Sequence, residues 1–370
     1  MRTISLGRSE ISVPVVGLGT MGIGGYFDPD QGHDQEFTAR LRQGIDLGAT
    51  LVDTAEIYGA GHAEELVGAA VKACREKVVV ATKFSPEHSQ SADVLKAAEG
   101  SLRRLKMEVI DLYQTHWPNP SVPFEETIGA LRRLLDAGKV RTVGLSNASV
   151  RQWKQAQAAF GPHEIVSFQQ QYNLADRFVE TTLLPVCQQE GLVLIAYSPL
   201  LEGKIAPDDP RRRQLETLAH GLNVTVGQVV LAWLLRHPTV VVIPKAANPI
   251  HLKENIAASA LTLDGEAVRL IDELYAPRIM ELVPGQIDVE DAAGRQVYKT
   301  LAEALENPAR MSPSPRELAE EFVAGEPFRP IKVRRTPGDE GTYTLVEGRL
   351  RYWAWVIAHG NQRSIACTLV

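Results

Sequence analysis

Four residues whose side chains handle protons stand at or just after short apolar runs of the sequence. Asp53 ends the run that begins at Leu51, and Tyr58 follows in a loop rich in glycine. Lys83 stands near the end of VVVATKF, and His116 ends VIDLYQTH. Each residue alone has an ordinary structural explanation, such as a turn cap or a side chain that covers an edge. Their shared position after successive apolar runs favours a common chemical role.

The chemistry that this set predicts is proton donation to a carbonyl oxygen. A phenol has an unperturbed pKa near ~10 and is a weak acid at neutral pH, but a nearby ammonium stabilises the anion and lowers that pKa. Lys83 would supply the ammonium, and Asp53 would be its counter-ion. A neutral His116 can hydrogen-bond a substrate carbonyl and hold it over the Tyr58 phenol.

These residues lie together only if the apolar runs are neighbouring strands. Short β-branched runs alternate with amphipathic stretches of helical period up to about residue 275. Eight strand and helix units predict an α/β fold, the (β/α)8 TIM barrel, whose strands present polar residues at one rim. We expect a hairpin at 1–13, strands at 13–19, 49–55, 77–84, 109–116, 140–147, 164–172, 192–200 and 240–246, and helices at 36–48, 62–75, 92–105, 124–138, 150–160, 181–191, 225–238 and 251–259.

The segment GLGTMG at 17–22 fits a competing pattern, the G-x-G-x-x-G sequence of Rossmann dinucleotide-binding folds. Asp53 would then be the acid that binds the ribose. That pattern requires a helix directly after the glycines, whereas GIGGYFDPDQG is too rich in Gly, Pro and Asp for a first helical turn. We therefore prefer the barrel to an open doubly wound sheet.

Bulk properties exclude several classes of protein. The chain has 370 residues and a net charge of -6, which argues against general binding to nucleic acid or to an anionic membrane. The sequence shows no leader pattern and no long apolar run, so a cytoplasmic protein is expected. The cysteines are scattered and form no CxxC pair, so neither a disulfide framework nor a metal site is predicted at Cys74, Cys187 and Cys367.

The region from about Met1 to Tyr275 resembles the aldo-keto reductase superfamily in the segments LVDTAEIYG, VVVATKF, IDLYQTHWP, GLSN, FQQQYN, AYSPL and IPKAANPIHLKENIAA. The resemblance implies a barrel that binds NADP(H), with Tyr58 as general acid, Lys83 and Asp53 tuning it, and His116 orienting the carbonyl. It implies that the carboxamide and the nicotinamide ring contact Ser146, Asn147, Gln169 and Tyr197. The ribose and pyrophosphate would be lined by Gly19, Thr20, Met21, Asp53, Ser198, Pro199 and Leu200.

The segment PKAANPIHLKEN bears on cofactor choice. By the same resemblance, Lys245 corresponds to the lysine at the adenosine 2′-phosphate, and Glu254 and Asn255 correspond to adenine contacts. His251 and Ala246 stand where many members have an arginine and a serine, so a bidentate phosphate partner is replaced by a weaker one. NADPH is still expected to bind better than NADH. His251 is either a phosphate contact or a solvent-exposed residue of the first helical turn.

Beyond residue 275 the alternation stops, and we expect a linker at 276–282 and a compact α+β domain at 283–370. This domain resembles the ParB/sulfiredoxin-like type in PIKVRR and VEGRLRYWA, with helices at 314–325 and 349–360 and strands at 330–335, 342–348 and 364–370. The resemblance implies a nucleotide phosphate site at Glu347, Gly348, Arg349 and Arg351. Alternatively, the arginines on the face of the preceding strand alternate into solvent and pair with acids such as Glu326 and Glu347.

Two classes of function fit these observations. In the first, the protein is an NADPH-dependent reductase of an aldehyde or ketone whose identity the sequence does not specify. In the second, the barrel senses its cofactor and the end domain is a nucleotide-gated or kinase-like output. The intact proton-donating set favours the first. From Glu281 onward 11 Lys and Arg stand against 13 Asp and Glu, so binding to nucleic acid gains no support, and no membrane partner is expected.

Overall fold

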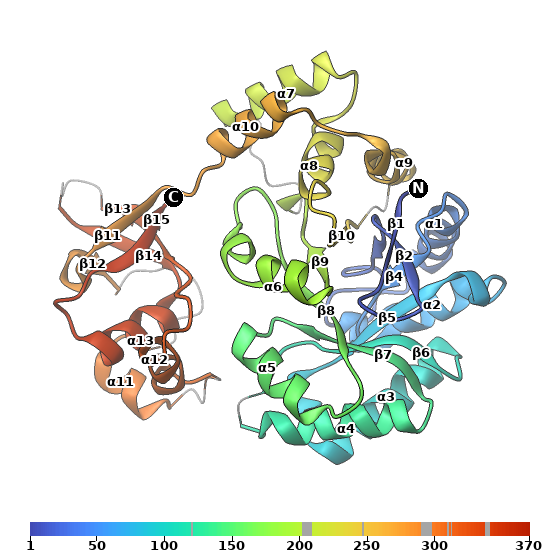
Figure 1. Ribbon diagram of the computed structural model, residues 1–370, viewed down its shortest axis with the longest axis horizontal. Coiled ribbons are helices and arrows are strands. Elements are labelled where there is room, and N and C mark those ends of the chain that lie inside the picture. Colours follow the sequence, from blue (N-terminus) through green and yellow to red (C-terminus); the bar gives the residue numbers. More distant parts are fainter. Residues whose placement is uncertain are drawn as a thin grey trace. The chain divides into compact units, whose positions relative to one another are not determined.

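The computed structural model describes residues 1–119, 121–201, 209–245, 248–289, 298–308, 311, 313–336 and 341–370. Over these residues the chain forms two compact units, Met1–Tyr275 and Ala276–Val370, and each unit is described by itself (Figure 1).

The first unit is built around eight parallel strands that lie in chain order and curl into a barrel (Figure 1). The sheet closes where Val16 pairs in parallel with Val242, and the Gly17 backbone N–H donates to the Val242 carbonyl at 2.9 Å. This arrangement confirms the predicted (β/α)8 barrel. The strands are β3 (Leu18–Gly19), β4 (Leu51–Asp53), β5 (Val79–Phe84), β6 (Ile110–Thr115), β7 (Val140–Ser146), β8 (Ile165–Gln171), β9 (Val193–Tyr197) and β10 (Val240–Val242).

Helices cover the outer face of this sheet (Figure 1). Every residue of β5 and β6 is buried, as expected for parallel strands packed on both faces. The α-helices of this unit are α1 (Asp34–Asp46), α2 (His62–Val71), α3 (Ser91–Leu105), α4 (Phe124–Asp136), α5 (Val150–Ala159), α6 (Leu183–Glu190), α7 (Pro210–Gly221), α8 (Val226–Leu234), α9 (Pro249–Ala257) and α10 (Gly265–Leu274). Short 3-10 turns are η1 (Tyr58–Gly61), η2 (Arg75–Lys77), η3 (Pro86–His88), η4 (Phe178–Thr181) and η6 (Ala258–Ala260).

The predicted hairpin forms from β1 (Thr3–Ser5) and β2 (Ser12–Pro14), which pair antiparallel. Its apolar side chains Leu6, Ile11 and Val13 are buried in one cluster with inward-facing residues of the barrel strands. The hairpin therefore fills one end of the barrel interior. Polar residues that could form an active site are expected at the other end, where the strands have their carboxyl ends.

The barrel differs from the sequence expectation at its first strand and in its helix count. The run 13–19 is divided, because Ser12–Pro14 belongs to the hairpin and only Leu18–Gly19 joins the barrel as β3. Helices α7 and α10 were not predicted. Among the described residues no single helix is long and apolar enough to span a membrane, and α7 with α8 reaches that length and composition only as a pair bent by 92°.

The second unit is an α+β fold with its own core. Its five strands lie in the order β11-β15-β13-β14-β12, and Trp353 and Tyr352 of one helix pack among the buried residues of the sheet. The predicted linker 276–282 is wrong in its second half, because Ile279–Leu282 forms β11 and pairs antiparallel with β15. The elements are β11 (Ile279–Leu282), η7 (Pro284–Gln286), β12 (Ile287–Asp288), α11 (Leu301–Glu306), α12 (Pro315–Val323), β13 (Ile331–Arg335), β14 (Tyr343–Glu347), α13 (Arg349–His359) and β15 (Ile365–Leu369).

Candidate active site

The four predicted proton-handling residues meet at the carboxyl ends of neighbouring strands. Asp53 ends β4, Lys83 lies near the end of β5, and His116 directly follows β6. Tyr58 begins the turn η1 in the loop after β4. The strands pair in parallel register, with Asp53 opposite Ala81 and Lys83 opposite Gln114, so the fold brings all four side chains to one rim.

Lys83 is fully buried and paired. Its Nζ donates to Asp53 Oδ1 at 2.6 Å and to the Thr54 carbonyl at 2.8 Å, and the second oxygen of Asp53 accepts from Gln169 Nε2 at 2.7 Å. Burial alone would lower the pKa of Lys83, but the charge of Asp53 and the contact with Tyr58 outweigh it and raise that pKa. The lysine therefore stays an ammonium beside the phenol.

The Tyr58 phenol lies against this ammonium, with Lys83 Nζ 5.3 Å from the ring centroid. Burial raises the pKa of Tyr58, and Lys83 offsets that rise only in part. The Lys83 charge lowers the pKa of Tyr58 as predicted, but the predicted net decrease is wrong, because burial of the phenol is the larger effect. Without substrate, Tyr58 is a protonated donor at neutral pH.

His116 stands next to the phenol as a neutral ring. The two rings meet edge to face with centroids 5.7 Å apart, and Trp117 stacks on the imidazole at 4.0 Å. Burial, with a smaller effect of the Lys83 charge, lowers the pKa of His116 to about 2. Its Nδ1 is buried and has no hydrogen-bond partner in the described part of the chain. The ring is thus a neutral hydrogen-bonding group at any ordinary pH.

The predicted carboxamide contacts lie at the ends of β7, β8 and β9. Asn147 adopts a left-handed backbone conformation with φ 55°, and its Nδ2 donates to the His116 carbonyl at 2.9 Å and to Ser146 Oγ at 3.1 Å. The Tyr197 hydroxyl donates to Asn147 Oδ1 at 2.9 Å. Gln169 instead contacts Asp53. These residues therefore form one polar surface that adjoins the proton-donating set.

The predicted ribose and pyrophosphate contacts adjoin the same rim. Thr20 is buried and donates its hydroxyl to the Asp53 carbonyl at 2.9 Å. A side chain at Gly19 would begin 2.6 Å from the Ile243 carbonyl oxygen, so only glycine fits between β3 and the end of β10. The remaining members follow β3 and β9, namely Met21, which is exposed, Ser198 and Leu200, which are half-buried, and Pro199, which is buried.

Lys245 and His251 have different surroundings. Lys245 is exposed, and its Nζ lies 5.6 Å from the centroid of the Tyr26 ring. His251 pairs through Nδ1 with Glu254 of the same helix at 3.0 Å and is largely exposed. Asn255 is buried. Ala246 lies outside the described residues.

In the second unit the predicted arginines contact protein groups. Arg349 is buried and donates to the Val289 carbonyl. Arg351 donates to the carbonyls of Arg329 at 2.8 Å and Pro330 at 2.9 Å, and pairs with Glu347 at 3.5 Å. Gly348 caps α13 with φ 102°. On the preceding strand β13, Lys332 pairs with Glu347 at 2.6 Å.

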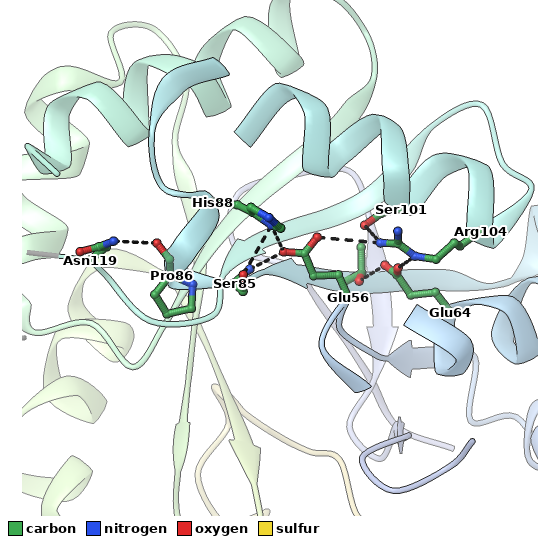
Figure 2. A network of polar contacts seen from close by, with 9 residues as sticks. Glu56, Glu64, Ser85, Pro86, His88, Ser101, Arg104 and Asn119 are labelled. Atoms are coloured by element: carbon green, nitrogen blue, oxygen red, sulfur yellow. Dashed lines mark hydrogen bonds and ion pairs between the residues drawn. The ribbon is translucent and has the colours of Figure 1, made fainter. Parts of the chain in front are cut away.

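A buried ionic network that was not predicted from the sequence includes Glu56 of the loop after β4 (Figure 2). It joins Glu56, Glu64 and Arg104, with Ser85 and His88 at its edge. A signal was present, because Glu64 and Arg104 are charged residues at positions of their helices where apolar periodicity predicts burial.

Residues 15–276 match the aldo/keto reductase family. Methylglyoxal reductase YeaE of Escherichia coli strain K12 is 37% identical over 271 residues, which cover 73% of this chain and 94% of that protein. The crystal structure of the thermostable aldo-keto reductase Tm1743 with the inhibitor epalrestat has 41% identity and a TM-score of 0.71, covering 74% of this chain and 100% of that one. An aldo/keto reductase from Klebsiella pneumoniae in complex with NADP and acetate has 38% identity and a TM-score of 0.67, covering 72% and 93%.

The chain therefore belongs to the aldo/keto reductase family of oxidoreductases, which confirms the resemblance for the first unit. The family match ends at residue 276. The comparisons thus give no support to the ParB/sulfiredoxin-like resemblance of the second unit.

Proposed function

We propose that this protein is an NADP(H)-dependent reductase of an aldehyde or ketone. The observation that carries the proposal is the buried group formed by Tyr58, Lys83 and Asp53 with neutral His116 at one rim of the barrel. A buried ammonium at a phenol has no evident structural benefit that an apolar pair would lack. It does stabilise the phenolate that remains after a proton is given away.

The residues present fit the cofactor. The amide of Asn147 and the hydroxyl of Ser146 are suited to a carboxamide, and the exposed ammonium of Lys245 is suited to a phosphate. Gly19 leaves backbone at the rim without a side chain in the way. The related enzyme from Klebsiella pneumoniae was crystallised with NADP, which supports the same cofactor here.

Residues of the chain would supply the proton for the carbonyl oxygen. When bound, NADPH supplies the hydride that reduces the carbonyl carbon. Tyr58 donates its proton to the carbonyl oxygen, while Lys83 stabilises the resulting phenolate. Asp53 keeps Lys83 charged. His116 donates a hydrogen bond to the same carbonyl oxygen and, because it is neutral, does not compete as an acid.

We propose small aldehydes, with methylglyoxal first, as the substrates to test. The support is the 37% identity to a methylglyoxal reductase over most of its length. Exposed Trp117 stacks on His116 and offers apolar surface to a small carbonyl compound.

The nucleotide site of the second unit stays a prediction, as does its ParB/sulfiredoxin-like classification. Its support is the glycine cap of α13 beside Arg351. Against it, Arg349 and Arg351 already hold backbone carbonyls and Glu347. A bound phosphate would have to displace part of these contacts.

The direct test is to measure NADPH consumption by the whole chain with methylglyoxal and a panel of aldehydes and ketones. We expect turnover with at least one small aldehyde and tighter binding of NADPH than of NADH. Lys245→Ala should weaken NADPH binding roughly tenfold or more, the scale of one charge-assisted phosphate contact, and leave NADH binding unchanged. Lys253→Ala, which removes an exposed lysine from the neighbouring helix, is the control.

Two results would contradict the proposal. Equal affinities for NADPH and NADH would remove the assigned role of Lys245. NADPH binding without turnover of any carbonyl compound would favour the alternative, a cofactor-sensing barrel.

A further inference from the structure

Two buried carboxylates lie on either side of Tyr58 in the sequence. Glu56 precedes it by two residues in the loop after β4, and Glu64 follows it in the first turn of α2. The side chain of Glu56 is 8% exposed and that of Glu64 is 0% exposed. Figure 2 shows both carboxylates pointing toward Arg104 of α3. Charged groups are buried in this way only when they are paired, so the network fixes the segment between them.

Glu56 ties the Tyr58 loop to the segment after Lys83. Its Oε1 accepts from the Ser85 backbone N–H at 2.7 Å and from His88 Nδ1 at 2.7 Å. Its own backbone N–H donates to the Lys83 carbonyl at 3.1 Å. Glu56, two residues before Tyr58, is therefore held against the segment that contains Lys83.

Arg104 connects the two carboxylates. Its Nε donates to Glu64 Oε2 at 2.7 Å, and its Nη2 lies 3.9 Å from Glu56 Oε2. The other oxygen of Glu64 accepts from Thr82 Oγ1 at 2.6 Å, one residue before Lys83 on β5. The guanidinium thus links the loop, the start of α2 and the wall of the barrel.

The backbone of the Tyr58 turn is shaped around this arginine. Gly61 ends the turn with φ 96°, and a Cβ there would lie 2.5 Å from Arg104 Cδ. Only glycine allows the arginine side chain to pass so close beneath the turn. Burial raises the pKa of Glu64, and Arg104 opposes that rise. Loss of Arg104 would therefore leave a buried carboxylate without its cation.

We propose that Arg104 is a positioning residue for proton donation: through Glu56 and Glu64 it fixes the Tyr58 phenol against the Lys83 ammonium. This role rests on the proposed reductase function. Arg104 donates hydrogen bonds to Glu64 and Ser101 and forms an ion pair with Glu56 at 3.9 Å, and the proton-donating set is not among these partners, so it acts through the loop. A shift of about 1 Å at reacting groups can cost on the order of 10² in rate.

The test compares Arg104→Lys and the double variant Arg104→Gln with Glu64→Gln against Arg103→Gln. The double variant removes the Glu64 charge together with its cation, and Glu56 keeps its contacts with Ser85 and His88, so the variant is expected to fold. Arg103 is an exposed neighbour on the same helix and serves as the control. The readouts are kcat and KM for carbonyl reduction, NADPH affinity, thermal midpoint, and the pH profile of alcohol oxidation, in which the Tyr58 phenolate is the base.

We expect both Arg104 variants to lose kcat by a factor of roughly 10 to 10², with NADPH affinity unchanged. The pH profile of oxidation should move to higher pH, because a phenol that spends less time beside an ammonium has a higher pKa. Arg104→Lys should keep more thermal stability than the double variant but still have a lower kcat than the wild type, since one ammonium cannot span both carboxylates.

If Arg104 had a purely structural role, its variants would have a lower thermal midpoint but the kcat and pH profile of Arg103→Gln. That result would overturn the positioning role of Arg104 and leave the proposed reductase function standing. A wild-type chain without turnover would overturn the reductase function and, with it, this role.

Discussion

At the scale of single residues, two opposing effects determine the pKa of Tyr58. Burial raises its pKa and the Lys83 charge lowers it, and burial is the larger. A phenol that is protonated at neutral pH suits the proposed reduction, in which it donates a proton to the carbonyl oxygen. Residue types and spacing predicted the ammonium at the phenol. They could not predict the net shift, since the depth of burial depends on how the loops pack.

His116 gives a prediction about pH and stability. Its pKa is about 2 in the folded chain and near ~6.5 when unfolded. Below about pH 6.5 the unfolded chain gains a proton that the folded chain does not, so the free energy of unfolding falls as pH falls. This residue contributes a slope of up to about 1.4 kcal/mol per pH unit.

The measurement is denaturant unfolding of the wild type and His116→Gln over a pH series. The difference between the two isolates His116 from the carboxylates, and we expect the wild type to lose stability faster below about pH 6.5. If the unfolding free energies of the two proteins changed with pH in parallel, His116 would take up a proton below about pH 6.5 in the folded state as well. That result would contradict the lowered pKa.

At the scale of elements, the loop after β4 is held by close backbone contacts. Gly59 has φ 55°, its N–H donates to the Tyr26 carbonyl at 2.9 Å, and a Cβ would lie 2.2 Å from the Gly24 carbonyl oxygen. The loops after β3 and β4 therefore fit together only with glycine at this position.

Gly59→Ala should lower both stability and kcat, because the loop that carries Tyr58 must move away from Gly24. The matched control is Gly138→Ala, since Gly138 has φ 68° but open space around its Cα. That control should lose about 1 kcal/mol of unfolding free energy from backbone strain alone and keep its kcat. If both variants lost the same unfolding free energy and kept the wild-type kcat, the close fit of the two loops would be disproved.

The strands that the sequence predicted best are the largely buried strands β5 to β9. The runs that became β5 to β9 are rich in apolar and β-branched residues, so their existence followed from composition. The bounds of the first barrel strand did not follow from composition, because Pro14 and the residues before it belong to the hairpin. Helix α7 buries only Leu215 and Ala219 among its residues and has a weak period. Helix α10 was not predicted, although its sequence carries an apolar stripe that includes Ala267 and Ile271.

At the scale of the whole molecule, each unit has its own core. The barrel core ends with Tyr275, and the second core begins with Leu282 of β11. The sequence placed a linker at 276–282 because the helix and strand alternation ends there. It missed β11 because a four-residue edge strand has too little period to detect.

The boundary gives a prediction about fragments. A fragment of residues 276–370 should unfold cooperatively, whereas 283–370 should be less stable by about 2 kcal/mol or more, because it loses the buried Leu282 and uncovers β15 as an edge. Urea unfolding followed by circular dichroism measures both. Equal unfolding free energies would mean that β11 contributes nothing to this unit.

The central claim is that Tyr58 donates the proton in carbonyl reduction, and single-turnover reduction of methylglyoxal by NADPH-loaded Tyr58→Phe tests it most directly. We predict unchanged NADPH affinity, because the phenylalanine ring keeps the shape of the site, and a reduction rate lower by a factor on the order of 10² or more. Reduction by the variant at close to the wild-type rate would contradict the claim.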